Sequence, residues 1–152
     1  MERSLIGILG ASGKVGQLVC DYLVRNTGYI VKAGYRKTIP FLFNGRLRWQ
    51  FVDIQDKQKL FEFCRDCKII INCIGSSRNI NLNLAFMAHE VGAIYIDTYG
   101  TGKLKKELVN RDIVNSGCYI LGAGVYPGLT GIAINYLVKK YPIINKCNGM
   151  AG

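Results

Sequence analysis

The sequence predicts an α/β fold, a Rossmann-type doubly wound parallel sheet of about six strands. Short apolar runs alternate with amphipathic stretches along nearly all of the 152 residues, which is typical of parallel strands joined by helices. Glycines recur at every third position where the first apolar run ends, as they do in nucleotide-binding turns. Several later runs also end at Gly or Asp, so we expect the ligand-binding loops at one edge of the sheet.

The first strand–helix–strand unit covers Leu5 to Tyr35. An apolar run over Leu5–Leu9 is too short for a helix and predicts a buried strand. The stretch Lys14–Asn26 predicts an amphipathic helix, and the β-rich run Tyr29–Tyr35 predicts the next strand. The apolar side chains at helical spacing, which would form the packed face of the helix, are Val15, Leu18, Val19, Tyr22 and Leu23.

The remaining elements continue the alternation after a loop over Thr38–Gly45. Further strands are predicted at Leu47–Val52, Lys68–Ile74, Ala93–Asp97 and Tyr119–Leu121. Helices are predicted at about Asp56–Cys67, Asn79–Val91 and Lys103–Asn115, with a last helix that follows the loop Gly122–Gly128 and ends near Lys140. The run Lys68–Ile74 is almost purely apolar, which indicates a strand buried on both faces.

The glycines of the first unit form a G-x-x-G-x-x-G relative of the dinucleotide fingerprint. Gly10 would allow a tight turn, Gly13 a close backbone approach to a pyrophosphate, and Gly16 close packing of the helix. The first N–H groups of the helix would then face the phosphates. The alternative is a glycine-rich turn in an α/β protein without a nucleotide. The residues predicted to hold the phosphates are Gly10, Ala11, Ser12, Gly13, Lys14 and Val15.

The second predicted strand ends in cations instead of a carboxylate. An NAD-binding domain offers Asp or Glu to the ribose at this point, whereas this chain has Arg36 and Lys37. No acidic residue lies between Asp21 and Asp53. A 2′-phosphate would find donors and no like charge, so NADP is favoured over NAD. The alternative is that both cations are solvated loop residues. The basic residues of this acid-free stretch are Arg25, Lys32, Arg36, Lys37, Arg46 and Arg48.

Further cofactor and substrate candidates follow from the other strand ends. Asp53 and Ile54 would meet the adenine, with Asp53 either bonding the adenine amino group or capping the next helix. Asp97 and Thr98 would face the nicotinamide end and could orient a substrate, although Asp at this position is as often a turn former. The candidates on the side of the nicotinamide ribose are Cys73, Ile74, Gly75 and Ser76.

No catalytic acid or base stands out in this sequence. His89, the single histidine, falls in a predicted helix well past a strand end, and is expected to be a structural or surface residue. Among the six cysteines, Cys20, Cys73 and Cys118 fall in predicted helix or strand positions as small apolar residues. Cys64 and Cys67 form a C-x-x-C without a second pair or a histidine cluster. We therefore expect no metal site.

Composition narrows the class of protein. The net charge of +10 would suit a protein that binds nucleic acid, but the basic residues are dispersed and the sequence has no nucleic-acid-binding motif. We expect no nucleic acid partner. The longest uncharged stretch, Ile113–Val138, is broken by glycines and a proline, so no membrane span is expected. The start of the chain runs straight into the first strand without a secretory signal, which predicts a cytoplasmic protein.

Four segments together resemble one family. They are GASGKVG at Gly10–Gly16, NCIGSS at Asn72–Ser77, GAIYIDTYG at Gly92–Gly100 and GAGVYPGLTG at Gly122–Gly131. The chain from about Leu5 to Tyr141 is similar to the N-terminal NADP-binding domain of the saccharopine dehydrogenase family. The first segment is shared by many families, and the later three in this order are more specific.

The resemblance implies a two-domain NAD(P)-dependent oxidoreductase. Residues 1–141 would form the cofactor domain, and residues 142–152 would begin a truncated second domain that supplies much of the substrate site and a homodimer contact. The resemblance implies a small-molecule substrate of an amino-acid-like kind. The catalytic residues and the precise substrate stay open.

Two other functions compete with this interpretation. A short-chain-dehydrogenase-like reductase would need Tyr and Lys four residues apart on a helix beside the nicotinamide. Tyr99 with Lys103 and Tyr136 with Lys140 have this spacing, but neither pair has a suitably placed strand-end serine before it. A non-catalytic NADP(H)-sensing module is the second alternative, since the cofactor motif is present without evident chemistry.

Overall fold

The computed structural model describes residues 5–40, 44–75, 78–99, 102–125, 128–141, 143 and 146, with the backbone alone described for 78–81. Six strands form one parallel sheet in the order β3-β2-β1-β4-β5-β6. The predicted Rossmann-type doubly wound fold is confirmed. The strands are β1 (Leu5–Leu9), β2 (Ile30–Tyr35), β3 (Leu47–Phe51), β4 (Ile69–Asn72), β5 (Ile94–Asp97) and β6 (Tyr119–Leu121).

Five helices connect or follow these strands within the described residues. They are α1 (Lys14–Asn26), α2 (Lys57–Cys64), α3 (Arg78–Glu90), α4 (Gly102–Asn110) and α5 (Leu129–Lys140). The bounds of α1 agree with the prediction. Helices α2 and α4 end three and five residues earlier than predicted, at Cys64 and Asn110. Beyond α4, Asp112 has a φ of 54°, a left-handed conformation that a continuing helix does not accommodate.

The strand order reverses at β1, which pairs with β2 on one side and β4 on the other. Ile8 at the centre of the sheet lies beside Ala33 of β2 and Ile71 of β4. Ligands of doubly wound proteins bind beyond the carboxyl ends of the strands at such a reversal. The fold therefore points to the loops after β1, β2 and β4.

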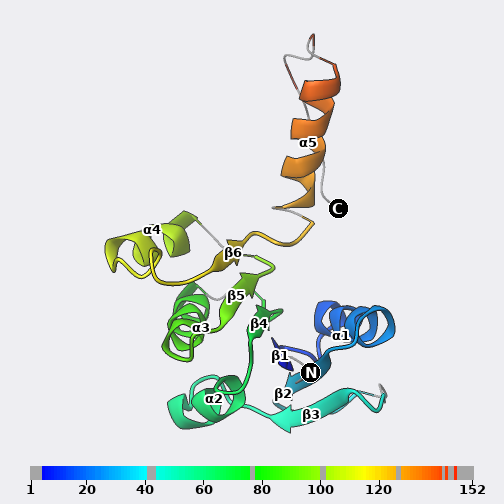
Figure 1. Ribbon diagram of the computed structural model, residues 1–152, viewed down its shortest axis with the longest axis vertical. Helices are drawn as coiled ribbons and strands as arrows, with labels where there is room; N and C mark the ends of the chain where they lie inside the picture. Colours follow the sequence, from blue (N-terminus) through cyan, green and yellow to red (C-terminus); the bar gives the residue numbers. More distant parts are fainter. Residues whose placement is uncertain are drawn as a thin grey trace.

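The helices cover the two faces of the sheet unequally. In Figure 1, α2, α3 and α4 lie on one side of the sheet, and α1 lies on the other. The first side holds the larger core, which includes Phe63, Leu84 and Tyr95. The α1 side holds a smaller core around Ile8 and Val31. The strand order explains this two-sided arrangement, because right-handed connections that run in opposite directions along a parallel sheet place their helices on opposite faces.

The face of β4, β5 and β6 that lies on the α1 side remains partly open within the described chain. Ile71, Ile96 and Ile120 are neighbours in register across these strands. Ile71 and Ile96 are half-buried, and Ile120 is 47% exposed. The expectation that the β4 run is buried on both faces is thus wrong for this face. No described helix packs over it, whereas Ile70 on the opposite face is fully buried.

The packed face of α1 also differs from the prediction. Its buried residues are Gly16, Cys20 and Val24, while Leu18 is 72% exposed. Val19 and Leu23 do pack partly against the core, but Val15 and Tyr22 are exposed as well. The helix lies so close to the turn after β1 that a small residue is needed at its first buried position. The face of α1 that packs against the sheet is therefore decided by the close approach of its backbone to the turn after β1. The periodicity of apolar residues does not reveal this approach.

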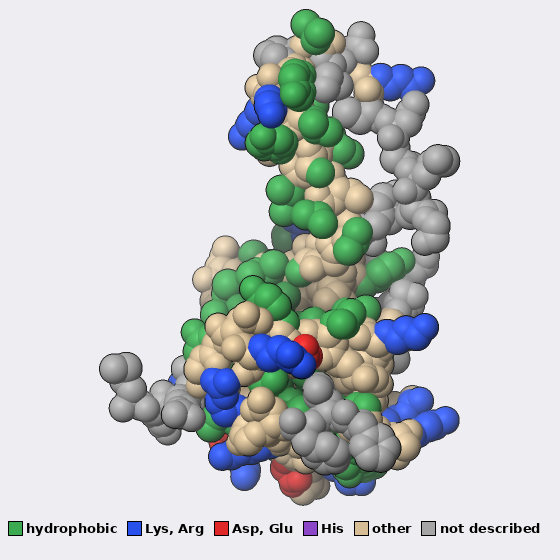
Figure 2. Space-filling view, turned by 90° about the vertical axis from the view of Figure 1, so that its right-hand side faces the viewer, with side chains coloured by type: hydrophobic (Ala, Val, Ile, Leu, Met, Phe, Trp, Pro, Cys, Tyr) green, Lys and Arg blue, Asp and Glu red, His purple; other side chains and the backbone are tan. Residues whose placement is uncertain are grey.

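Helix α5 stands away from the rest of the molecule in Figure 1. None of its residues is buried. Figure 2 shows hydrophobic side chains along this projecting helix and on the body below it. Its apolar surface includes Leu129, Ile132, Tyr136 and Leu137. No helix in the described part of the chain is long and apolar enough to cross a membrane.

The described cysteines are all free thiols. Cys20, Cys64 and Cys67 are buried, and burial raises the pKa of the Cys20 and Cys64 thiols to about 12. Cys118 is exposed and precedes β6 instead of lying in it, so its predicted packing role is wrong. Residues 142–152 lie outside the described part of the chain apart from Ile143 and Lys146.

Candidate cofactor site

The turn between β1 and α1 has the geometry that its glycines predict. Gly10 has a φ of +76°, which favours glycine, and a Cβ atom there would lie 3.0 Å from the backbone of Cys73. A Cβ at Gly16 would lie 2.2 Å from the carbonyl oxygen of Gly10 and 2.6 Å from Cα of Ala11. Gly16 therefore allows α1 to begin directly against the turn.

The N-terminus of α1 is open. Its N-cap residue is Gly13, no side chain caps it, and its first turn contains no acidic residue. The backbone N–H groups of Lys14, Val15 and Gly16 have no acceptor among the described residues. Free N–H groups and the positive end of the helix dipole together favour an anion. This end of α1 faces the edge of the sheet where the strand order reverses.

A cavity of about 290 Å³ lies beside the turn. It is formed by the ends of four adjacent strands and the loops that follow them. Its lining residues are Gly10, Ser12, Gly13, Gly34, Tyr35, Arg36, Val52, Ile54, Cys73, Ile74 and Gly75. The structure thus brings eight of the sequence-predicted cofactor residues together around one cavity.

Other predicted cofactor residues lie close to this cavity without lining it. Ala11 is buried, and its N–H donates to the carbonyl of Gly34 at 3.1 Å. Lys14 and Val15 are exposed in the first turn of α1. Lys37 is exposed, outside the lining. Ser76 lies outside the described residues.

Three lining residues were not predicted from the sequence. They are Gly34, Tyr35 and Val52, at the ends of β2 and β3. A usable signal exists for Gly34, because glycine inside a strand often marks close approach of another backbone. Its missing Cβ would lie 2.8 Å from Val52 and 3.1 Å from the carbonyl of Ile8.

Arg36 is the cation that reaches the cavity. It is exposed, and it makes no hydrogen bond or ion pair with the described residues. Three other cations of the acid-free stretch have structural contacts instead. Lys32 is buried and donates to the carbonyl of Phe63 at 2.8 Å, and Arg25 pairs with Asp21 at 2.7 Å. Arg46 donates to the carbonyls of Thr27 and Val24 at the end of α1.

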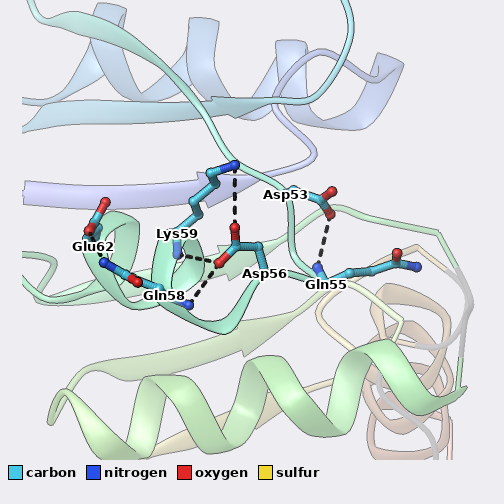
Figure 3. A network of polar contacts seen from close by, with 6 residues as sticks. All are labelled: Asp53, Gln55, Asp56, Gln58, Lys59 and Glu62. Atoms are coloured by element: carbon cyan, nitrogen blue, oxygen red, sulfur yellow. Dashed lines mark hydrogen bonds and ion pairs between the residues drawn. The ribbon is translucent and has the colours of Figure 1, made fainter.

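Asp53 does not cap α2. Its side chain accepts from the N–H of Gln55 at 3.0 Å, which forms a turn before the helix. The cap is Asp56, whose Oδ1 accepts from the N–H groups of Gln58 and Lys59 at 3.1 Å each (Figure 3). The hydrogen bond from Lys59 N–H is the main cause that lowers the pKa of Asp56. The adenine contact stays a prediction for Asp53 and Ile54.

Asp97, the last residue of β5, is fully buried. Its Oδ1 accepts from the N–H of Tyr99 at 2.8 Å, as expected of a turn former. Its Oδ2 accepts from the hydroxyl of Tyr95 at 2.9 Å. The hydroxyl of Thr98 donates to the carbonyl of Asn72 at 3.0 Å. The substrate contact stays a prediction for Asp97 and Thr98.

The candidate groups for proton transfer lie elsewhere or are held neutral. Burial raises the pKa of the Cys73 thiol, which lines the cavity, to about 11. Nδ1 of His89 lies 2.9 Å from the Tyr119 hydroxyl at the opposite end of the sheet, which fits its predicted structural role. Tyr99 precedes α4 and shares no helix with Lys103, and Tyr136 lies on the projecting α5.

Fold and site together define a doubly wound α/β domain of the Rossmann type. Residues 6–112 match the family model described as saccharopine dehydrogenase NADP binding domain. The chain belongs to this family. The comparison with curated proteins gave no match.

Solved structures show the same fold. Apo saccharopine dehydrogenase (L-Glu forming) from Saccharomyces cerevisiae superposes with a TM-score of 0.74 and 18% identity, covering 90% of this chain and 31% of that chain. A Veillonella parvula short-chain dehydrogenase/reductase in complex with NADP superposes with a TM-score of 0.57 and 18% identity, covering 68% of this chain and 50% of that chain. Uronate dehydrogenase from Agrobacterium tumefaciens with NAD superposes with a TM-score of 0.55 and 14% identity, covering 64% of this chain and 41% of that chain. The chain spans half or less of each of these proteins.

Proposed function

We propose that this chain is the NADP(H)-binding part of an oxidoreductase. The observation that carries the proposal is that the open N-terminus of α1 and Arg36, which has no partner among the described residues, lie at one cavity. The helix offers free N–H groups to a pyrophosphate, and the guanidinium offers two parallel donors to a 2′-phosphate. Membership of the NADP binding domain family supports the same cofactor.

The cofactor would lie across the carboxyl ends of the strands. Its pyrophosphate would rest on Gly10–Gly13 and the first turn of α1, with the adenosine half toward Arg36 and Ile54. The nicotinamide half would then extend toward Ile74 and Gly75, on the other side of the reversal in strand order. When bound, NADP(H) supplies hydride chemistry, and the chain holds and orients it. The similarity to saccharopine dehydrogenase leads us to propose an amino-acid-like substrate.

The cofactor preference is tested by fluorescence titration with NADPH and NADH. We expect tighter binding of NADPH. Replacing Arg36→Asp should weaken NADPH about 10-fold to 100-fold, on the order of 1 to 3 kcal/mol, while NADH changes little because it lacks the 2′-phosphate.

Lys105→Asp provides a matched control for net charge, because Lys105 is exposed on α4, across the sheet from α1. Its NADPH affinity should equal that of the unmodified chain. Equal affinity for both cofactors, or an equal effect of both substitutions, would show that Arg36 does not select the phosphate.

A further inference from the structure

Two neighbouring loops form the nicotinamide side of the proposed cofactor site. The loop after β4 supplies Cys73, Ile74 and Gly75 to the cavity lining, and the loop after β5 begins at Thr98. The strands that carry these loops are paired, with Asn72 in register with Asp97. Contacts that hold the end of β5 against the end of β4 therefore act on the loop that lines the cavity.

Three polar side chains lie together directly beneath both loops. Asn72, Tyr95 and Asp97 are each fully buried. The Asn72 amide nitrogen donates to Oδ2 of Asp97 and to the hydroxyl of Tyr95, at 3.2 Å in both cases. The Tyr95 hydroxyl donates to the same Oδ2 at 2.9 Å. Burial of the phenol, with Asp97 beside it, strongly raises the pKa of Tyr95, so this hydroxyl remains a donor.

The same side chains hold the backbone of both loops. Oδ1 of Asn72 accepts from the N–H of Ile74 at 3.0 Å, and Oδ1 of Asp97 accepts from the N–H of Tyr99 at 2.8 Å. Thr98 adds a cross-link, because its N–H and its hydroxyl both donate to the carbonyl of Asn72. Asn72 therefore holds the loop after β4 and Asp97 holds the loop after β5, and these two side chains are hydrogen-bonded to each other across the paired strands.

The orientation of the Asn72 amide follows from these partners. Its nitrogen faces a carboxylate oxygen and its oxygen faces a backbone N–H, so a flipped amide would lose both interactions. Buried networks of this kind specify one local geometry because an unpaired member is costly. The adenosine side, by contrast, depends on the loops after β2 and β3.

We propose that Asn72, Tyr95 and Asp97 form a positioning unit for the nicotinamide half of the dinucleotide. The proposal rests on the proposed cofactor function. The unit fixes the loop after β4 relative to the loop after β5, and it does not contact the adenosine phosphate. Disturbing it should weaken the binding of the whole dinucleotide and spare a ligand that contains the adenosine half alone.

The test compares NADPH with 2′,5′-ADP, which carries the adenosine and the 2′-phosphate without a nicotinamide. Asn72→Asp places a second carboxylate next to Asp97 and removes the amide donor. Because two adjacent carboxylates cannot both ionise without cost, we expect about a 10-fold loss of NADPH affinity. The affinity for 2′,5′-ADP, measured by isothermal titration calorimetry, should stay within about 2-fold of the unmodified chain, because the adenosine half would be held by the loops after β2 and β3, which the network does not hold.

The exchanged double variant Asn72→Asp with Asp97→Asn is the matched rescue. It again pairs one amide with one carboxylate, and should recover most of the NADPH affinity that either single variant loses. Tyr95→Phe keeps the ring and removes only the hydroxyl, so it is the variant that retains the packing. It should weaken NADPH binding about 3-fold and leave the affinity for 2′,5′-ADP unchanged.

Equal losses for both ligands, or no NADPH loss in any variant, would overturn the positioning unit. Failure of the exchanged pair to recover affinity would also count against it. These outcomes differ from failure of the cofactor proposal, in which the unmodified chain would bind neither NADPH nor 2′,5′-ADP.

Discussion

Helices α1 and α2 begin at equivalent places in the fold, but only α2 has a side chain that caps its N-terminus. Each follows a parallel strand at the carboxyl edge of the sheet. At α2, Asp56 accepts from two N–H groups and pairs with Lys59 at 3.4 Å. At α1, Gly13 offers no side chain, and no acidic residue follows in the first turn. A side chain caps one helix terminus, whereas the other has no side-chain cap among the described residues and is open to the anion that we propose.

The contrast separates stability from binding. An N-cap carboxylate stabilises the folded chain whether or not a ligand is present. The N–H groups of an uncapped terminus are solvated in the free protein and can be satisfied by a phosphate. Substitutions at the start of α1 should therefore change cofactor affinity, whether or not they also change stability, and substitutions at the start of α2 should change stability alone. Three experiments test this division.

The largest effect is expected at Gly16, where α1 meets the turn. Gly16→Ala would place a Cβ 2.2 Å from the Gly10 carbonyl, so the helix must move away from the loop. We expect at least about 30-fold weaker NADPH binding, and a loss on the order of 2 kcal/mol in the free energy of unfolding, measured by urea denaturation. Alanine is otherwise preferred over glycine in a helix, so a loss would report the clash.

Gly28→Ala is the control for this substitution. Nothing lies within 4 Å of the Cβ that it would add. It should leave NADPH affinity unchanged and stability nearly so. If Gly16→Ala behaved like this control, the close contact between α1 and the turn after β1 would not exist.

The parts of this corner that sequence predicts are the local ones. The run Leu5–Leu9, the spaced glycines and the bounds of α1 all follow from neighbouring residues. The packed face of α1 does not, because Leu18 and Tyr22 are as apolar as a core position requires. Only the approach of the helix to another backbone shows that Gly16 and Cys20 face inward.

Long-range contacts decide the other differences. Asp97 has the position of a ligand-binding residue, yet its partner Asn72 belongs to another strand, and that pairing buries its carboxylate. The sequence offers Asp53 as a possible cap of α2, whereas in the structure Asp53 forms a turn with Gln55 and Asp56 caps the helix. The open face of β4 to β6 is equally invisible in the sequence, because it depends on which helices cover which strands.

A smaller effect is expected when α1 is given a cap of its own. Gly13 has φ −77° and ψ 165°, a conformation that any residue adopts. Gly13→Asp would place a carboxylate where a phosphate should bind. We expect about 10-fold weaker NADPH binding from like-charge repulsion, together with unchanged or slightly higher stability, by up to about 1 kcal/mol. Fluorescence titration and urea denaturation of the same sample measure the two quantities.

Gly13→Ala separates the carboxylate from the added bulk. Its Cβ would lie 3.3 Å from the Gly10 carbonyl, a tight contact shared by both variants. NADPH should bind this variant more tightly than Gly13→Asp. If the two variants bound NADPH equally, the phosphates would not lie at this helix terminus.

The smallest effect is expected at the capped helix. Asp56→Ala removes the acceptor for Gln58 and Lys59, so the melting temperature should fall, by less than in Gly16→Ala, with NADPH affinity unchanged. Because hydrogen bonding lowers the pKa of folded Asp56 below its ordinary value of 3.8, its stabilisation is fully present above that value. The stabilisation should disappear as the pH falls through the lowered pKa. Melting curves from pH 7 into the acid range measure this dependence.

Asp56→Asn distinguishes the cap from its charge. Asparagine caps helices about as well as aspartate but does not titrate, so this variant should stay close to the unmodified chain at pH 7. The difference in melting temperature between Asp56→Asn and Asp56→Ala should not change as the pH falls, because neither side chain takes up a proton. A loss of NADPH affinity in Asp56→Ala without loss of folded structure would contradict the division of roles, since it would connect the capped helix to the cofactor site.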